Sequence, residues 1–255
     1  MRFACQVYST KFAKMFGMNS NAFETWFKQQ QQLAIQPIVA FDPQRDKLLS
    51  MDFTENNQAL TTALIADTNS FSKYITDTLN AANAIYGIGG YNEHRTVYAR
   101  SRVFDGAVAT DARCIHLGVD IWGDAGTAVA APLTGTVHSF AFNDAYGDYG
   151  ATIILAHQIE GMHFHSLYGH LALADLTDLS VGQQIQAGEV FAHFGVPADN
   201  GQWPPHLHFQ LIINMEGKEG DYPGVCSLAN RATYLNNCPD PDILLNLIQW
   251  AKPLA

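Results

Sequence analysis

The chain has 255 residues, of which 47% are hydrophobic and 15% charged, so it can bury one good core and a smaller appended unit. Its formal net charge of −10 argues against a nucleic-acid backbone as partner, because such a partner requires a basic patch. No apolar run of about twenty residues predicts a membrane span, and the start Met1–Thr10 lacks the apolar core of a secretion signal. We therefore expect the protein in the cytoplasm, or outside it if a leader is missing or export follows another route.

Residues 1–90 are poor in strand patterns and are expected to form a small, mostly helical region. The segment Phe12–Gln32 carries aromatic residues among polar ones, and its glutamine run is expected to end a helix. Asn57–Ala84 is the stronger helix, because its large apolar residues recur at steps of three to four positions or multiples of them. Gly87–Gly90 then breaks the pattern. This region either covers a face of the domain that follows or partly closes a cleft in it.

From residue 91 to residue 255 the sequence changes to short strand-like runs separated by Gly, Pro, Asn and Asp. Turn signals recur about every ten residues, which favours antiparallel pairing over alternating strands and helices. We predict a mainly β fold, a Gly-rich antiparallel β sandwich with the small helical region at its N-terminus. Predicted strands are Thr127–Ala131, Gly135–Phe142, Ala151–His157, His163–Tyr168, Glu189–Phe194 and His206–Ile213, and a closing helix is predicted at Ile243–Trp250.

Three short segments concentrate the residues that carry chemistry. They are His116-Leu-Gly-Val-Asp120, Tyr168-Gly-His170 and Pro205-His206-Leu-His208. Residues two or four apart on a strand share a face, so the polar side chains of the first and of the third segment can each point one way. A spacing of four also fits a helix, but the β-branched neighbours of His116 favour a strand. Zinc accepts imidazole and carboxylate in a tetrahedral shell, and three protein ligands leave one position open for water.

The order of these segments resembles the lysostaphin-type zinc endopeptidases, whose members mostly cut peptide cross-links in bacterial cell walls. That family's signature is a His-x-x-x-Asp segment, a later His near a Tyr or Gly, and a terminal His-x-His. The resemblance covers roughly residues 91 to 213 and implies His116, Asp120 and His208 as Zn²⁺ ligands. It implies His170 and His206 as the catalytic pair. Residues 201–205 depart from the small polar residues usual before the last motif, which puts the substrate subsites in doubt.

Zinc in such a site would lower the pKa of its bound water and polarise the scissile carbonyl. No carboxylate base is evident, so the base role falls jointly to His170 and His206, because an unperturbed imidazole titrates near working pH. Tyr168 is either a donor to the developing oxyanion or a buried strand tyrosine. The segments Asp144–Gly150 and Pro197–Pro205, the second of which contains Trp203, are expected to wall a groove.

The remaining histidines and the cysteines are expected to have structural roles. His163 and His165 alternate just ahead of Tyr168 and either line the cleft rim or pack. Cys114 lies two positions before His116 and either approaches the metal or packs, with packing favoured. The four cysteines, which show no Cys-x-x-Cys spacing and permit either disulfides or free thiols, are Cys5, Cys114, Cys226 and Cys238. The single histidines interpreted as surface or packed groups are His94, His138, His157 and His193.

The predicted function is that of a zinc-dependent metalloendopeptidase, a hydrolase whose first expected substrate is the peptide cross-link of peptidoglycan. That substrate lies outside the cytoplasm, so it conflicts with the expected location unless a leader is missing, export is non-standard or the substrate is an intracellular peptide. A second hypothesis is a non-catalytic binding or regulatory module of the same fold. A third is a sugar-phosphotransfer carrier with a related β sandwich, which would not need Asp120.

Overall fold

The computed structural model describes residues 18–30, 32–106 and 111–253. Across these residues the strands are β1 (Leu48–Met51), β2 (Tyr86–Gly89), β3 (Arg113–His116), β4 (Val119–Trp122), β5 (Ala128–Ala130), β6 (Gly135–Asn143), β7 (Gly150–Ile159), β8 (Met162–Leu171), β9 (Gln184–Ile185), β10 (Val190–His193), β11 (His206–Ile212), β12 (Val225–Ser227) and β13 (Ala251–Lys252). The α-helices are α2 (Ser20–Lys28), α3 (Thr62–Ala66), α4 (Thr68–Ala82), α5 (Arg231–Asn237) and α6 (Asp242–Leu245). Two 3₁₀ turns before β3, η1 (Val97–Arg100) and η2 (Arg102–Phe104), matter for the site.

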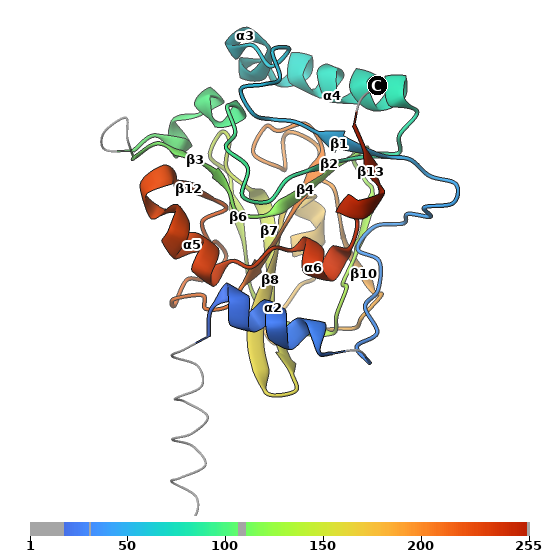
Figure 1. Ribbon diagram of the computed structural model, residues 1–255, viewed down its shortest axis with the longest axis vertical. Coiled ribbons are helices and arrows are strands. Elements are labelled where there is room, and N and C mark those ends of the chain that lie inside the picture. Colours follow the sequence, from blue (N-terminus) through green and yellow to red (C-terminus); the bar gives the residue numbers. More distant parts are fainter. Residues whose placement is uncertain (1–17, 31, 107–110, 254–255) are drawn as a thin grey trace, which may run out of the picture.

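The centre of the described chain is one nine-stranded sheet in the order β13-β1-β2-β4-β11-β8-β7-β6-β9 (Figure 1). Two ribbons of two strands, β10-β5 and β12-β3, lie beside it. Pairing is antiparallel except where β1 meets β2 and β13. The mainly β, mainly antiparallel fold predicted from the sequence is confirmed, with all six predicted strands present and their ends shifted by up to three residues.

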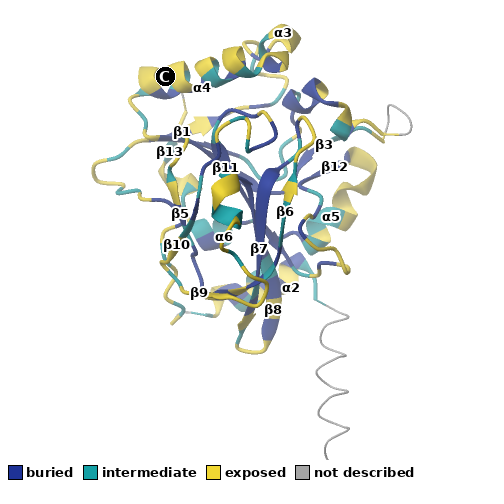
Figure 2. Cartoon of the chain, turned by 180° about the vertical axis from the view of Figure 1, so that it is seen from behind, coloured by how far each residue is buried: buried dark blue, intermediate teal, exposed yellow. Residues whose placement is uncertain are grey.

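The long hairpin β7–β8 forms because alternating apolar residues on both strands meet over a tight turn. The turn is Glu160-Gly161, and both residues have positive φ, 48° and 79°, as a two-residue hairpin of matching twist requires. Buried residues of these strands and of β11 build the central core, which includes Ile153, Leu155 and Phe209. Figure 2 shows these strands buried, whereas the outer faces of the helices are exposed.

The helices cover the sheet at two places. In α4 the buried residues Phe71, Ile75 and Leu79 lie at steps of four, and Asp67 begins the helix by accepting a hydrogen bond from the Ser70 amide. The predicted helix at Asn57–Ala84 is therefore divided, because the extended residue at 67 separates α3 from α4. At the other end of the sheet α2 packs Phe23 on Phe164 (Figure 1).

The N-terminal helical prediction is met only in part. Of the predicted Phe12–Gln32 helix, residues 12–17 and 31 lie outside the described residues, and α2 ends at Lys28. Residues 1–90 also contribute β1 and β2, which the sequence did not indicate, and β2 pairs with β4 across the proposed boundary at residue 90. The closing helix is shorter than predicted, with α6 followed by a 3₁₀ turn at Ile248–Trp250. Among the described residues, every helix is too short or too polar to cross a membrane.

Candidate metal centre

Adjacent strands bring the candidate ligands together. In the register of β11, His208 lies opposite Asp120 of β4 on one side and opposite Gly169 of β8 on the other. His116 is the last residue of β3, and Leu117-Gly118 turns the chain into β4. His116 and Asp120 therefore lie on two successive strands, not on one face of a single strand as their spacing suggested. Gly118 is required here, because a Cβ at this position would lie 2.5 Å from His208 Cε1.

Within the described ranges, one group of three side chains presents metal-ligand atoms at close range, and it is His116, Asp120 and His208. His116 Nε2 lies 3.2 Å and His208 Nδ1 lies 3.1 Å from Asp120 Oδ1, and the two nitrogens are 2.9 Å apart. Zinc bonds of about 2.0–2.1 Å in a tetrahedral shell place neighbouring ligand atoms about 3.3 Å apart. The three donors therefore fit a tetrahedral ion with one position left for another ligand.

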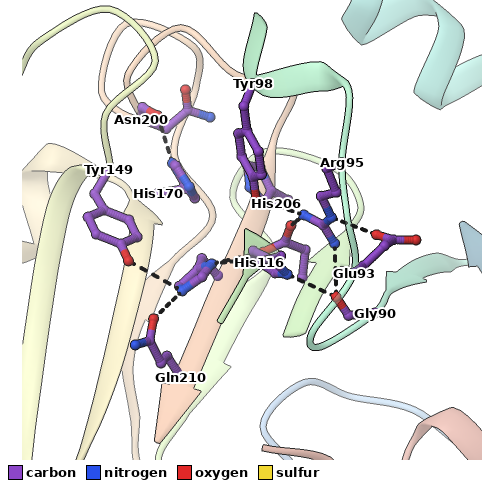
Figure 3. Close-up of polar contacts among 12 residues, drawn as sticks. Gly90, Glu93, Arg95, Tyr98, His116, Tyr149, His170, Asn200, His206 and Gln210 are labelled. Atoms are coloured by element: carbon purple, nitrogen blue, oxygen red, sulfur yellow. Dashed lines mark hydrogen bonds and ion pairs between the residues drawn. The ribbon is translucent and has the colours of Figure 1, made fainter. Parts of the chain in front are cut away.

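The outer nitrogen of each candidate ligand ring is already bonded, which fixes its tautomer. His116 Nδ1 donates to the carbonyl oxygen of Gly90 at 3.0 Å, so Nε2 keeps its lone pair. His208 Nε2 donates to Gln210 Oε1 at 2.9 Å, which leaves Nδ1 as the free donor atom. Figure 3 shows the contact between His116 and Gly90. Such outer contacts orient metal-binding histidines and raise their basicity.

A buried arginine that the sequence analysis missed lies against the carboxylate. Arg95 pairs with Asp120 Oδ2 through Nη1, and its Nε lies 2.6 Å from Glu93 Oε2 (Figure 3). Burial by itself would raise the pKa of Asp120, but His116 and Arg95 together hold that pKa well below its usual range. The carboxylate is therefore ionised, as a metal ligand must be.

The second histidine pair lies beside the first. The ring centroids of His170 and His206 are 4.1 Å apart, and His206 stacks on Trp122 at 3.9 Å. Each ring donates its Nδ1 proton to a backbone carbonyl, His170 to Asn200 at 2.9 Å and His206 to Pro204 at 2.8 Å. In both rings Nε2 therefore carries the lone pair. Burial lowers the pKa of His206 to about 4 and, with His206 as a further cause, lowers the pKa of His170 well below 6.5.

His170 is also held in an uncommon backbone conformation. Its φ of 63° lies in the left-handed region, which costs a residue other than glycine roughly 1–3 kcal/mol. Two backbone hydrogen bonds of 2.8 Å fix it there, from its amide to Tyr149 and from the Gly195 amide to its carbonyl. The surrounding structure therefore enforces the orientation of this ring.

All five candidate side chains line one pocket of about 150 Å³, and each is no more than 6% exposed. The predicted wall segments Asp144–Gly150 and Pro197–Pro205 both contribute to its lining, the second through Trp203. From the other side η1 and η2 add Tyr98 and Phe104. The pocket is therefore small, partly aromatic and closed in by the segment that precedes β3.

The role considered for Tyr168 is not supported, because its ring lies in the core. Tyr168 is fully buried between Phe191 and Phe209, and it is not among the described residues that line the pocket. Tyr149, in contrast, lines the pocket, and its hydroxyl donates to the Tyr222 carbonyl at 3.2 Å. Its hydroxyl lies 3.4 Å from His208 Nε2 and faces the pocket from the opposite wall to Tyr98 (Figure 3).

The other candidates lie away from the pocket. His163 and His165 are not among its described lining residues, and the ring of His165 is instead 5.0 Å from that of His138. Cys114 packs beside a hydrophobic cluster and is absent from the metal-ligand group found among the described residues. The free thiols of the described chain are Cys114, Cys226 and Cys238, and Cys5 lies outside the described residues.

Comparison with known proteins gives a family match for part of the chain. Residues 114–219 match the model of peptidase family M23. No curated protein matches. A zinc containing peptidase from Vibrio cholerae is 24% identical, with a TM-score of 0.31 over 38% of this chain and 27% of that one.

Two further solved structures are similar to this chain. A putative peptidase M23 from Pseudomonas aeruginosa is 26% identical, with a TM-score of 0.32 over 51% of this chain and 43% of that one. The catalytic domain of the antimicrobial peptidase lysostaphin from Staphylococcus simulans is 20% identical, with a TM-score of 0.37 over 64% of this chain and 96% of that one. The chain thus spans less than half the length of the Vibrio and Pseudomonas proteins. The segment that matches the family model contains all five candidate side chains, including the three donors, so residues 114–219 are similar to peptidase family M23 in the part of the chain that forms the pocket.

Proposed function

We propose that this protein is a zinc-dependent metallopeptidase in which His116, Asp120 and His208 hold the ion and His170 and His206 act as the catalytic pair. One observation carries the proposal: five side chains from separate segments face one pocket with three donor atoms 2.9–3.2 Å apart. The match to the family model supports the same chemistry. A zinc ion held there would polarise the scissile carbonyl and lower the pKa of the attacking water.

The histidine pair is suited to move one proton. Each ring is neutral at neutral pH, because burial lowers its pKa, and each presents an unprotonated Nε2. One ring accepts the proton of the attacking water and returns it to the leaving amine. The centroids are only 4.1 Å apart, so the first proton on the pair opposes a second. We therefore treat His170 and His206 as a unit that takes up one proton, and not two, during the reaction.

Tyr149 replaces Tyr168 as the candidate donor to the developing oxyanion. Burial raises the pKa of the Tyr149 hydroxyl well above its usual range, so the hydroxyl keeps its proton. The hydroxyl lines the pocket beside His208 and donates to the Tyr222 carbonyl, so in this proposal it turns from that carbonyl to the oxyanion of a bound substrate. A phenylalanine at this position would keep the ring and remove the donor.

We propose a peptide as the substrate, with the cross-link of peptidoglycan as the first choice because of the resemblance to lysostaphin-type enzymes. The test joins metal analysis of the purified protein to hydrolysis of purified wall fragments, with and without a chelator. We expect one zinc per chain and hydrolysis that the chelator abolishes and added zinc restores. Zinc without hydrolysis of wall fragments or of an unrelated peptide library would favour a binding module. Hydrolysis of the library alone would favour a peptidase with a substrate other than the wall.

A further inference from the structure

The loop between β2 and β3 supplies the outer contacts of two candidate ligands. The Gly90 carbonyl accepts the Nδ1 proton of His116, and Arg95 pairs with Asp120. Both residues lie before position 114, outside the segment that matches the family model. We propose that Arg95 is a positioning residue that holds Asp120 as a one-oxygen metal ligand, an inference that rests on the proposed zinc site.

The two carboxylate oxygens of Asp120 have different partners. Oδ2 is paired with Arg95, whereas Oδ1 faces both His116 Nε2 and His208 Nδ1. An unrestrained carboxylate rotates about its last bond and binds an ion through either oxygen or through both. The guanidinium removes this freedom, because it holds Oδ2 on the side away from the two nitrogens. Asp120 is thereby set in the orientation that a three-ligand site requires before any ion arrives.

The guanidinium can position another group because it is itself fixed on several sides. Glu93 bonds Nε at 2.6 Å, and the Phe53 ring lies under the guanidinium with its centroid 5.1 Å away. The Tyr98 hydroxyl lies 3.4 Å from Nη1. Gly89 makes room for this arrangement, since a Cβ there would lie 2.7 Å from Nη2. The Arg95 side chain is 2% exposed.

A test of Arg95 has to separate the effect of its charge on zinc affinity from its effect on the orientation of Asp120. Removing the guanidinium alone would leave Glu93 without its ion-pair partner near the site. The net charge around the site would become more negative, and this would raise the affinity for a cation whether or not the orientation of Asp120 changed. The double change Arg95→Met with Glu93→Gln removes one positive and one negative charge together. It keeps the length of the side chain at position 93, replaces the arginine stem with an unbranched uncharged side chain, and leaves Asp120 Oδ2 without its ion-pair partner.

The experiment measures the zinc dissociation constant by competition with a chromogenic chelator, starting from metal-free protein. We expect R95M/E93Q to bind zinc about 10–100-fold more weakly than the parent, as outer-contact changes at metal sites usually do. Arg95→Lys keeps the charge but loses the planar fork, and we expect an intermediate loss. Arg100→Met is the matched control. It removes another buried guanidinium, which stacks on Trp203 and, among the described residues, pairs with no carboxylate. We expect it to leave zinc affinity within about threefold of the parent.

The outcomes separate this inference from the proposed function. A parent protein that binds no zinc overturns the zinc site itself. A parent that binds zinc, with R95M/E93Q binding as tightly, overturns only the role of Arg95, and so does an equal loss in R100M. If R95M/E93Q does not fold, the decision falls to R95K, where unchanged affinity in a folded protein contradicts the proposal.

Discussion

Replacement of His157 by Gln tests how burial of a histidine couples the stability of this fold to pH. His157 lies in the sheet core, with Nδ1 3.0 Å from the Thr134 carbonyl and Nε2 2.7 Å from Ser166 Oγ. Its ring stacks on Phe164 at 4.8 Å, and burial lowers its pKa to about 4. Glutamine keeps a polar group of similar reach but does not titrate.

The size of the effect follows from the two pKa values. An unfolded chain protonates this histidine near pH 6.5, whereas the folded chain resists until about pH 4. Below pH 6.5 the unfolded state therefore binds more protons, and the contribution to the free energy of unfolding is full above 6.5 and is lost as pH falls. Between pH 7.5 and pH 5 the loss amounts to about 2 kcal/mol for this group alone.

The assay is urea unfolding of the parent and of H157Q at pH 7.5, 6 and 5 in the same buffer ionic strength. Other buried histidines change stability with the same sign, so the informative quantity is the difference in slope between the two proteins. We expect the parent to lose about 2 kcal/mol more than H157Q over this range. Equal slopes would refute the reasoning, because they would mean that the buried ring takes up its proton without cost.

Three further predictions concern the site. Asp120→Asn keeps the shape of the side chain but removes the charged ligand. We therefore expect zinc affinity to fall by more than about 100-fold, which exceeds the loss that usually follows a change in a residue contacting a ligand from outside. Stoichiometric zinc in this variant after gel filtration would contradict the ligand assignment. His206→Ala should bind zinc normally, because this ring is not among the three donors, and should lose about 10²–10⁴-fold in kcat on the wall-fragment substrate; hydrolysis at the parent rate would remove the assignment. Gly118→Ala places a Cβ 2.5 Å from His208 Cε1, so we expect a loss of about 1–3 kcal/mol in urea unfolding together with weaker zinc binding, and a variant equal to the parent in both would show that the turn tolerates a side chain.

The five candidate residues could be named from the sequence because their motifs resemble those of lysostaphin-type enzymes, whereas local geometry explains only part of their arrangement. Strand alternation places His206 and His208 on one face, and the same alternation extends to Gln210, whose contact with His208 was open to prediction. The register that sets His208 opposite Asp120 was not, since it depends on which strands become neighbours. The roles assigned to the five residues stay predictions until metal and activity are measured.

The sequence did not predict the role of Arg95 or the strands β1 and β2, and the physical reason is the same for all three. Arg95 reaches Asp120 across 25 positions through a segment without helical or strand periodicity, so no local pattern pairs them. β2 is Tyr86-Gly-Ile-Gly89, in which two glycines oppose strand propensity, and only burial against β4 makes it a strand. β1 pairs with β2, about 40 residues further along the chain, and with β13, about 200 residues further, and partners at such separations leave no trace in a short window.

The hydrogen bond from His116 to Gly90 and the β2–β4 pairing have a consequence for any attempt to trim this protein. A fragment reduced to residues 114–219 would retain all three proposed donors and both proposed bases. It would, however, lose β2, one of the two neighbours of β4, and Phe53, which packs on Trp122. The exposed edge would invite association with other chains. The shortest fragment that contains all five candidate residues is therefore shorter than the shortest fragment that keeps them in their folded arrangement.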